Sequence, residues 1–225
     1  MDEMPDTDAA KRSRVATRRR LVERAAPVFV EKGLEAASVA DLCAAAGFTR
    51  GAFYSNFGSK AELAVAVYEY RVDRLVELLH AEVDKQLRRQ VSVANMLQFV
   101  LEALTGLTHD GAWQGFRLEM HLAADRDPEL RVAVDEQYAR IVLAVADVLG
   151  RVAERGVRYR IPVEDLARIL IAVWDGELLR AGRRMDPKNG VGQRLITATW
   201  EAFVDGADQA HATWDHRGSP EATRR

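Results

Sequence analysis

The stretch GFTRGAFYSNFGSK, residues 47–60, places three phenylalanines and three glycines within fourteen residues. Small polar residues lie between them, and only Arg50 and Lys60 carry a charge. Large aromatic side chains favour burial, whereas glycine and small polar side chains leave room for a partner to approach. The segment is therefore expected to pack on one side and to remain open on the other.

The residues before and within this stretch predict two short helices. Residues 38–41, SVAD, form a capping-box pattern, with Ser38 as the N-cap and Asp41 as the third helical residue. Gly47 is the kind of residue that ends a helix. A second short helix is predicted from about Thr49 to Asn56. Two short helices joined through Gly47 predict a helix-turn-helix.

The remaining sequence predicts an all-α fold. Apolar residues recur with a period near 3.6, and no stretch alternates with a period of two. One helix is expected from about Thr17 to Lys32, and a long one from its cap at Ser59 to about Lys85. Further helices are expected near 92–107, 112–124, 128–156, 163–184 and 188–208. Residues 1–16 and 212–225 are expected to be disordered.

The outward face of the second short helix has the chemistry needed to read a DNA major groove. Phe48, Phe53 and Phe57 are expected to point inward and fix this helix against its neighbours. On the other face, Arg50 could read guanine and Asn56 adenine. The residues predicted to contact DNA are Ser38, Thr49, Arg50, Gly51, Ala52, Tyr54, Ser55, Asn56 and Lys60. The residues alone leave open a plain helical hairpin with a polar, solvent-facing side.

The charge distribution is uneven, although the net charge of the 225 residues is only −2. Residues 11–60 contain ten Lys or Arg and four Asp or Glu, a net charge of +6, so the rest of the chain carries −8. A basic end on an acidic body indicates a polyanionic partner for that end. A solvated run of charge is the alternative. Arg12, Arg14 and Arg18–Arg20 could likewise form an arm that reaches the minor groove, or a mobile basic tail.

Other protein classes find little support in the sequence. The single cysteine, Cys43, excludes an internal disulfide and a cysteine-rich metal site. No apolar run approaches the roughly 20 residues of a membrane span, and the polar start is unlike a secretory signal. Motifs of hydrolases, nucleotide-binding loops and metal sites are missing from the sequence. We therefore expect a cytoplasmic protein that is no enzyme and has no cofactor or metal, with a protein-binding helical adaptor as a remaining rival.

Residues 17 to about 70 resemble the N-terminal domain of the TetR family of bacterial transcriptional regulators. The matching stretches are LVERAAPVFVEKG and ASVADLCAAAGFTRGAFYSNFGSKAEL. The later stretch FRLEMHLAADRDPELR is similar, more loosely, to the regulatory domains of that family. The resemblance implies a helix-turn-helix DNA-binding domain at 17–62 and a helical regulatory and dimerisation domain at 63–211. It makes Thr49–Asn56 the recognition helix, and Tyr54 and Lys60 contacts to phosphate.

The resemblance also implies a homodimer on palindromic operator DNA that a small, largely apolar ligand releases, as in a repressor. The alternative is a constitutive or activating regulator without an inducer. The implied dimer residues are Leu166, Ile169, Leu170, Val173, Leu195, Thr199 and Phe203, which could equally be ordinary core. The implied ligand residues are Phe99, Trp113, Phe116, Met120 and Trp174, with Arg117, Glu119 or His121 as polar contacts.

Overall fold

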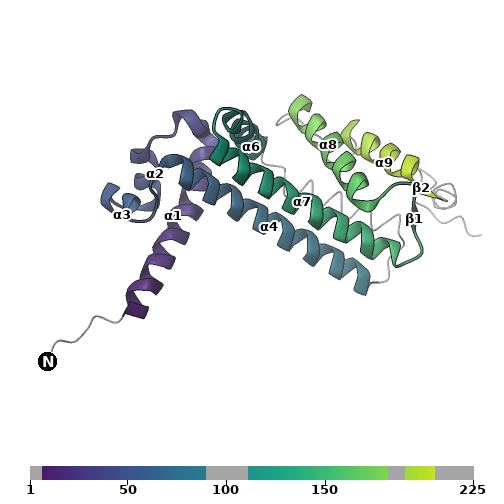
Figure 1. The fold of residues 1–225 in the computed structure, drawn as a ribbon, viewed down its shortest axis with the longest axis horizontal. Helices are drawn as coiled ribbons and strands as arrows, with labels where there is room; N and C mark the ends of the chain where they lie inside the picture. Colours follow the sequence, from purple (N-terminus) through teal and green to yellow (C-terminus); the bar gives the residue numbers. More distant parts are fainter. Residues whose placement is uncertain (1–6, 90–110, 182–190, 206–225) are drawn as a thin grey trace, which may run out of the picture.

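The computed structural model describes residues 7–89, 111–181 and 191–205 (Figure 1). At one end of the molecule lie α1 (Thr7–Ala36), α2 (Val39–Ala46) and α3 (Arg50–Tyr54), which together form the head. The long helix α4 (Lys60–Arg88) starts beside the head and continues into the rest of the protein, the body. The predicted order of a first helix, two short helices and then one long helix is confirmed.

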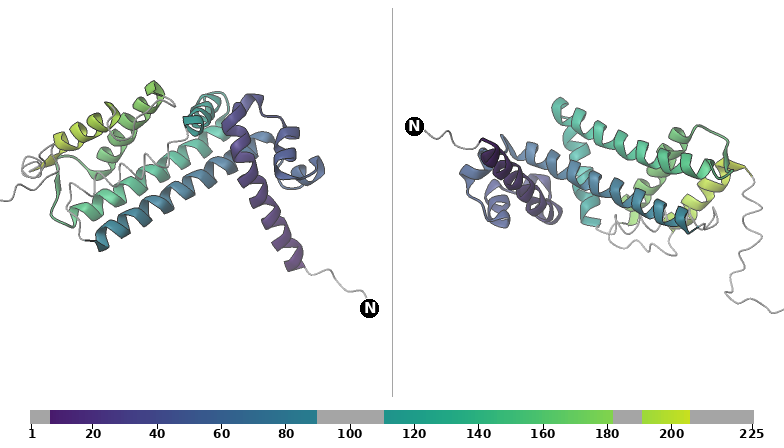
Figure 2. Two further views of the ribbon diagram at one scale, coloured as in Figure 1. Left: turned by 180° about the vertical axis from the view of Figure 1, so that it is seen from behind. Right: turned by 90° about the horizontal axis from the view of Figure 1, so that it is seen from below.

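The body is built on α4 and the helices that follow it. α7 (Pro128–Ala153) runs alongside α4, and α6 (Gly111–Ala124) crosses near the head (Figure 2). α8 (Val163–Ala181) packs on α7, and α9 (Val191–Phe203) packs on α8. Asp127 starts α7 as predicted, because its carboxylate accepts from the backbone of Glu129 and Leu130 and Pro128 occupies the first turn. The helix predicted near 92–107 lies outside the described residues.

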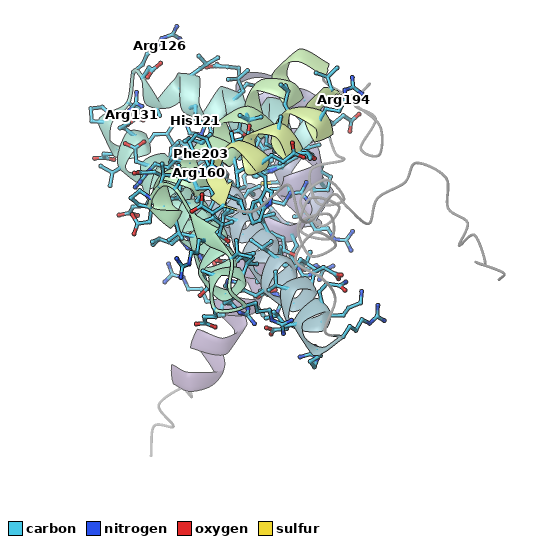
Figure 3. All side chains as sticks on the ribbon, turned by 90° about the vertical axis from the view of Figure 1, so that its right-hand side faces the viewer. His121, Arg126, Arg131, Arg160, Arg194 and Phe203 are labelled. Carbon is cyan, nitrogen blue, oxygen red and sulfur yellow. The ribbon has the colours of Figure 1, made fainter. Side chains whose placement is uncertain are left out.

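The predicted all-α fold is confirmed, with one short β-ladder that the sequence did not predict. β1 (Arg158–Tyr159) pairs antiparallel with β2 (Val204–Asp205). Arg160 fastens this ladder, since its backbone N–H donates to the Phe203 carbonyl at 2.9 Å and its Nε to Asp205 at 2.8 Å (Figure 3). Two paired residues are too few to produce a readable period of two, so the sequence pattern could not reveal them.

Helix α1 begins at Thr7, ten residues before its predicted start, so the predicted disorder of 7–16 is wrong. Alanine, lysine and arginine dominate these residues, and all three favour helix. The helix is interrupted at Gly33, where φ is 83° and ψ is 169°, a conformation that is accessible essentially only to glycine. Residues 1–6 and the predicted disordered tail at 212–225 lie outside the described residues.

One continuous buried cluster joins the head to the body. It contains Leu21 and Phe53 in the head and Met120 and Leu149 in the body. At the junction, the ring of Phe29 in α1 stacks on that of Phe116 in α6, with centroids 5.3 Å apart. A displacement of α6 therefore reaches α1 through direct packing. Within the described ranges, no helix is both long and apolar enough to cross a membrane.

Candidate functional site

The start of α2 is fixed by the predicted capping box. Ser38 Oγ accepts from the Asp41 backbone at 3.1 Å, and the Asp41 carboxylate accepts from the Ser38 backbone at 3.0 Å. Lys32 Nζ donates to the same carboxylate at 2.6 Å. This bond and the Ser38 hydrogen bonds hold the pKa of Asp41 well below its usual range. The N-terminus of α2 is thus held by its own side chains and by the end of α1.

The turn between α2 and α3 depends on Gly47. Its φ is 71°, in the left-handed region, and it closes α2 as predicted. Phe53 and Phe57 are fully buried, whereas Phe48 is half-buried beneath the guanidinium of Arg20. The aromatic residues therefore fix α3 against the head as the sequence predicted.

The opposite face of α3 is open. Thr49 Oγ1 caps the helix by accepting from the Ala52 backbone at 3.2 Å. Arg50 and Gly51 are exposed, and 59% of Tyr54 is exposed. An exposed tyrosine beside a glycine gives a surface with one prominent hydroxyl-bearing ring and little side-chain bulk nearby. That shape and chemistry fit a groove with phosphate walls.

Besides Ser38 and Thr49, three further predicted DNA contacts are engaged within the protein. Asn56 Nδ2 donates to the Ala52 carbonyl at 2.8 Å, and its Oδ1 is buried without a partner among the described residues. Ser55 Oγ donates to the same carbonyl at 2.9 Å. Lys60 Nζ donates to the Glu35 carbonyl at 2.9 Å. Reading of adenine by Asn56 remains a prediction that requires its amide to turn away from the helix.

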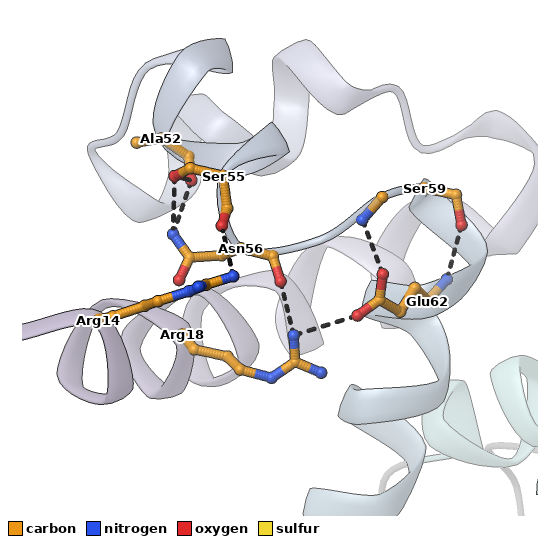
Figure 4. A network of polar contacts seen from close by, with 8 residues as sticks. Arg14, Arg18, Ala52, Ser55, Asn56, Ser59 and Glu62 are labelled. Atoms are coloured by element: carbon orange, nitrogen blue, oxygen red, sulfur yellow. Dashed lines mark hydrogen bonds and ion pairs between the residues drawn. The ribbon is translucent and has the colours of Figure 1, made fainter. Parts of the chain in front are cut away.

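The sequence analysis missed a polar network behind α3 (Figure 4). Arg14 and Arg18 of α1 donate to the carbonyls of Ser55 and Asn56, at 3.0 and 2.6 Å. Arg18 also contacts Glu62 at 3.2 Å. The two arginines are four residues apart in α1 and so share a helix face. The sequence could have indicated this only if the first helix had been predicted to include Arg14.

Most of the predicted ligand residues that are described lie in the buried core where α6 meets α4 and α8, and these residues, together with Tyr68, are called the aromatic cluster. Trp113, Phe116, Met120 and Trp174 are all buried. Tyr68 of α4, which the sequence analysis missed, joins them with its ring centroid 5.6 Å from that of Trp113. Phe99 lies outside the described residues.

Polar groups line the edge of this aromatic cluster. Arg117 pairs with Asp175 of α8, and His121 Nε2 lies 3.5 Å from the Tyr68 hydroxyl. Burial raises the pKa of Tyr68 to about 12, and burial followed by the nearby Arg117 charge lowers the pKa of His121. Trp174 Nε1 is buried and has no hydrogen-bond partner among the described residues.

Glu119 faces the head, not the aromatic cluster, which changes its predicted role as a ligand contact. Its carboxylate accepts from the Leu34 backbone N–H, directly after the interruption of α1. A Cβ on Gly33 would lie only 2.8 Å from Glu119 Oε1. Glu119 therefore bonds α6 to α1 at the one place where the backbone of α1 departs from a helix.

Comparisons with known proteins agree with this geometry. Residues 21–67 match the family model described as bacterial regulatory proteins of the tetR family. Residues 91–207, more than half of the chain, match the model of the Tetracyclin repressor-like C-terminal domain. The chain belongs to the TetR family. It is therefore a DNA-binding transcriptional regulator and not an enzyme.

Curated relatives include transcriptional regulators of several bacteria. The HTH-type transcriptional repressor AcnR of Corynebacterium efficiens is 29% identical over 170 residues, 74% of this chain and 82% of the relative. The HTH-type transcriptional regulator CymR of Pseudomonas putida is 32% identical over 142 residues, 63% of this chain and 68% of the relative. A putative TetR-family regulator from Mesorhizobium loti shares the fold, with a TM-score of 0.69, 18% identity, and coverage of 84% of this chain and 98% of that one.

The predicted dimer residues of this TetR-family chain divide into two groups. Leu166 is fully buried and Leu170 is 9% exposed, so both belong to the core of the protomer. Both lie on α8, which packs against α7 and α9, so their burial agrees with the alternative of ordinary core, and their role in a dimer stays a prediction. Ile169, Val173, Thr199 and Phe203 are half-buried, and Leu195 is 46% exposed. This second group keeps surface that a second protomer could cover.

Proposed function

We propose that this TetR-family regulator represses transcription by binding a palindromic operator as a homodimer, and that a small, largely apolar ligand releases it. The observation that carries the proposal is the open face of α3, which is presented by a basic head and fixed from behind by Phe53 and Phe57. Repression is the activity in the name of the relative AcnR. Such a regulator acts in the cytoplasm, where bacterial DNA lies.

DNA recognition in this proposal divides between base-reading and phosphate contacts. Arg50 is exposed at the start of α3, where a guanidinium can bind the O6 and N7 atoms of guanine. Tyr54 and Lys60 flank it and would bind phosphates. Each protomer places one α3 in one half-site, and the half-sites lie about 34–36 Å apart or at a multiple of that distance.

Dimerisation in this proposal uses the outer faces of α8 and α9. Leu195 and Val191 are exposed apolar residues on α9, at 46% and 42%. Val173 lies on the neighbouring α8, which packs directly against α9. Two such helices and their counterparts in a second protomer would bury the exposed leucine and form a four-helix bundle.

The ligand in this proposal binds at the aromatic cluster between α4, α6 and α8. Trp113, Phe116 and Tyr68 supply apolar surface, and Trp174 Nε1 supplies a hydrogen-bond donor without a partner among the described residues. A largely apolar molecule with one acceptor atom fits that lining. Insertion would move α6 and α4, which both contact α1, and would alter the spacing of the two α3 helices. The coupling required is about 1–3 kcal/mol.

The experiment that tests the proposal measures binding of the full chain to the duplex upstream of its own gene and to a scrambled duplex. Wild type should prefer the upstream duplex, and Arg50→Ala should reduce that preference. Addition of apolar aromatic compounds should release the duplex. Tight binding of such compounds with unchanged operator affinity would favour the alternative, a constitutive or activating regulator without an inducer. Equal affinity for both duplexes would refute the proposal.

A further inference from the structure

The recognition helix α3 is too short to hold its own orientation. It spans only five residues, Arg50–Tyr54, and so contains very few internal hydrogen bonds. Its final carbonyls need partners, because the last four carbonyls of any helix have none within it. The Ala52 carbonyl is satisfied by Ser55 and Asn56 side chains, and the Phe53 carbonyl accepts from the Asn56 and Phe57 backbone.

The carbonyls of the two residues that follow α3, Ser55 and Asn56, accept from arginines of another helix. Arg14 Nη2 donates to the Ser55 carbonyl at 3.0 Å, and Arg18 Nη1 donates to the Asn56 carbonyl at 2.6 Å. Cations at a helix C-terminus also interact favourably with the helix dipole. Helix α1 therefore holds the end of α3 through two side chains that lie one turn apart.

Arg18 makes three different contacts at this point, two of which, with Asn56 and Glu62, are drawn in Figure 4. Its guanidinium carbon lies 4.0 Å from the centroid of the Phe57 ring. Its Nη1 is 3.2 Å from Glu62 Oε1, in addition to the bond with the Asn56 carbonyl. Glu62 in turn accepts from the Gly58 backbone at 2.7 Å through its other oxygen. One planar side chain thus connects α1, the end of α3 and the start of α4.

We propose that Arg18 is a positioning residue for sequence readout, which orients α3 in the head and does not itself contact DNA. The inference rests on the proposed function, in which α3 reads base edges. Arg14 supports the same arrangement through a single bond. A lysine cannot replace Arg18, because an ammonium lacks the flat surface that covers Phe57 and the fork of donors that reaches both oxygens.

The test compares affinity for the operator with affinity for a scrambled duplex, over a range of salt concentrations. Arg18→Lys and Arg18→Met should both weaken operator binding by about tenfold. Both should leave scrambled-duplex affinity within about twofold and the salt slope unchanged, since no phosphate contact is lost. Arg19→Met is the matched control, because Arg19 is a neighbouring arginine that is 76% exposed and pairs with Glu23 of its own helix. It should preserve the operator preference.

Glu62→Gln provides a second test with the opposite change of charge. It weakens the network from its acidic side while it removes a negative charge from the head. Electrostatics alone predicts tighter binding to both duplexes, whereas loss of positioning predicts a lower operator preference, as for Arg18→Met. The double variant Arg18→Met/Glu62→Gln should show an operator preference no lower than that of the poorer single variant, because both changes disrupt one network.

Three results would overturn the inference. The first is a pattern in which Arg18→Lys binds like wild type, while Arg18→Met loses affinity equally for both duplexes and lowers the salt slope by about one per protomer. That pattern would make Arg18 a phosphate contact. Normal operator affinity in both variants, well below their unfolding temperatures, would make Arg18 only a stabilising residue. A Glu62→Gln variant that binds both duplexes more tightly by the same factor would also contradict the positioning role of Arg18. A wild type without operator preference would refute the proposed function itself, and this inference with it.

Discussion

The bond between Glu119 and the Leu34 backbone gives a quantitative prediction about the junction of head and body. Leu34 is 8% exposed, so Glu119→Ala leaves its N–H buried without this partner. The cost is about 1–3 kcal/mol. In a chain of this size, that corresponds to a fall of roughly 3–9 °C in the unfolding midpoint.

Gly33→Ala should destabilise the same junction in two ways. An alanine at φ 83° and ψ 169° is strained by about 1–3 kcal/mol. Its Cβ would also lie 2.8 Å from Glu119 Oε1 and push the carboxylate away from Leu34. The single variant therefore loses the same hydrogen bond that Glu119→Ala removes. The double variant should be no less stable than Gly33→Ala alone, so the two costs fall short of additivity by about 1–3 kcal/mol.

The assays are thermal unfolding, which gives the midpoint, and denaturant unfolding, which gives the free energy of unfolding. Both are followed by tryptophan fluorescence at one fixed protomer concentration, because the proposed dimerisation would contribute to apparent stability. Gly156→Ala is the matched control. Gly156 also has a positive φ, 95°, but a Cβ there meets nothing within 4 Å among the described residues. Its cost should add fully to that of Glu119→Ala. If the cost of Gly33→Ala also added fully to that of Glu119→Ala, the contact between Glu119 and the interruption of α1 would be refuted.

Three further predictions concern DNA, assembly and pH. Lys60→Ala should weaken binding to all duplexes about equally and lower the salt slope by roughly one per protomer. Arg50→Ala should cost about 1–3 kcal/mol of binding free energy per half-site on the operator alone. Equal losses on operator and scrambled duplexes would remove Arg50 from base reading. Leu195→Glu should dissociate the dimer, as measured by light scattering, and weaken operator binding. Val132→Glu, on an exposed residue of α7, should do neither. A Leu195→Glu variant that remains dimeric would exclude the α9 face as the dimer interface. Because the pKa of His121 is lower in the folded protein than the ordinary 6.5, the unfolded chain binds the proton more readily, so stability should fall as pH drops below about 6.5. His121→Gln should reduce the change of the unfolding midpoint between pH 7 and 5.5. The same pH dependence as in wild type would show that His121 does not cause the loss of stability.

The head was largely predictable from sequence because its signals are local. The Ser38 capping box, the Gly47 stop and the Ser59 cap each act within four residues, and all three are present in the structure. The early start of α1 was missed because charged, polar residues resemble a disordered tail when nothing shows what they contact. Arg14 and Arg18 find their partners about 40 residues away, in the turn after α3.

The body was less predictable because its contacts join distant helices. The sequence placed Trp113 and Phe116 in an apolar setting, but Tyr68 joins them from a helix more than 40 residues earlier. Glu119 was expected beside a ligand, since a helix period of 3.6 cannot say which neighbour each face meets. For the same reason, the apolar stripe of α8 could not separate core positions from dimer positions, and Leu166 and Leu170 are buried within the protomer.

The central claim is that two copies of α3 read a palindrome, and footprinting combined with measurement of the stoichiometry on the upstream duplex tests it most directly. The account predicts two protomers on one protected site with two symmetric half-sites, about 34–36 Å apart or at a multiple of that distance. It also predicts that Arg50→Ala lowers affinity for that site but not for a scrambled duplex. Protection without symmetry, or binding by a single protomer with full affinity, would contradict the account.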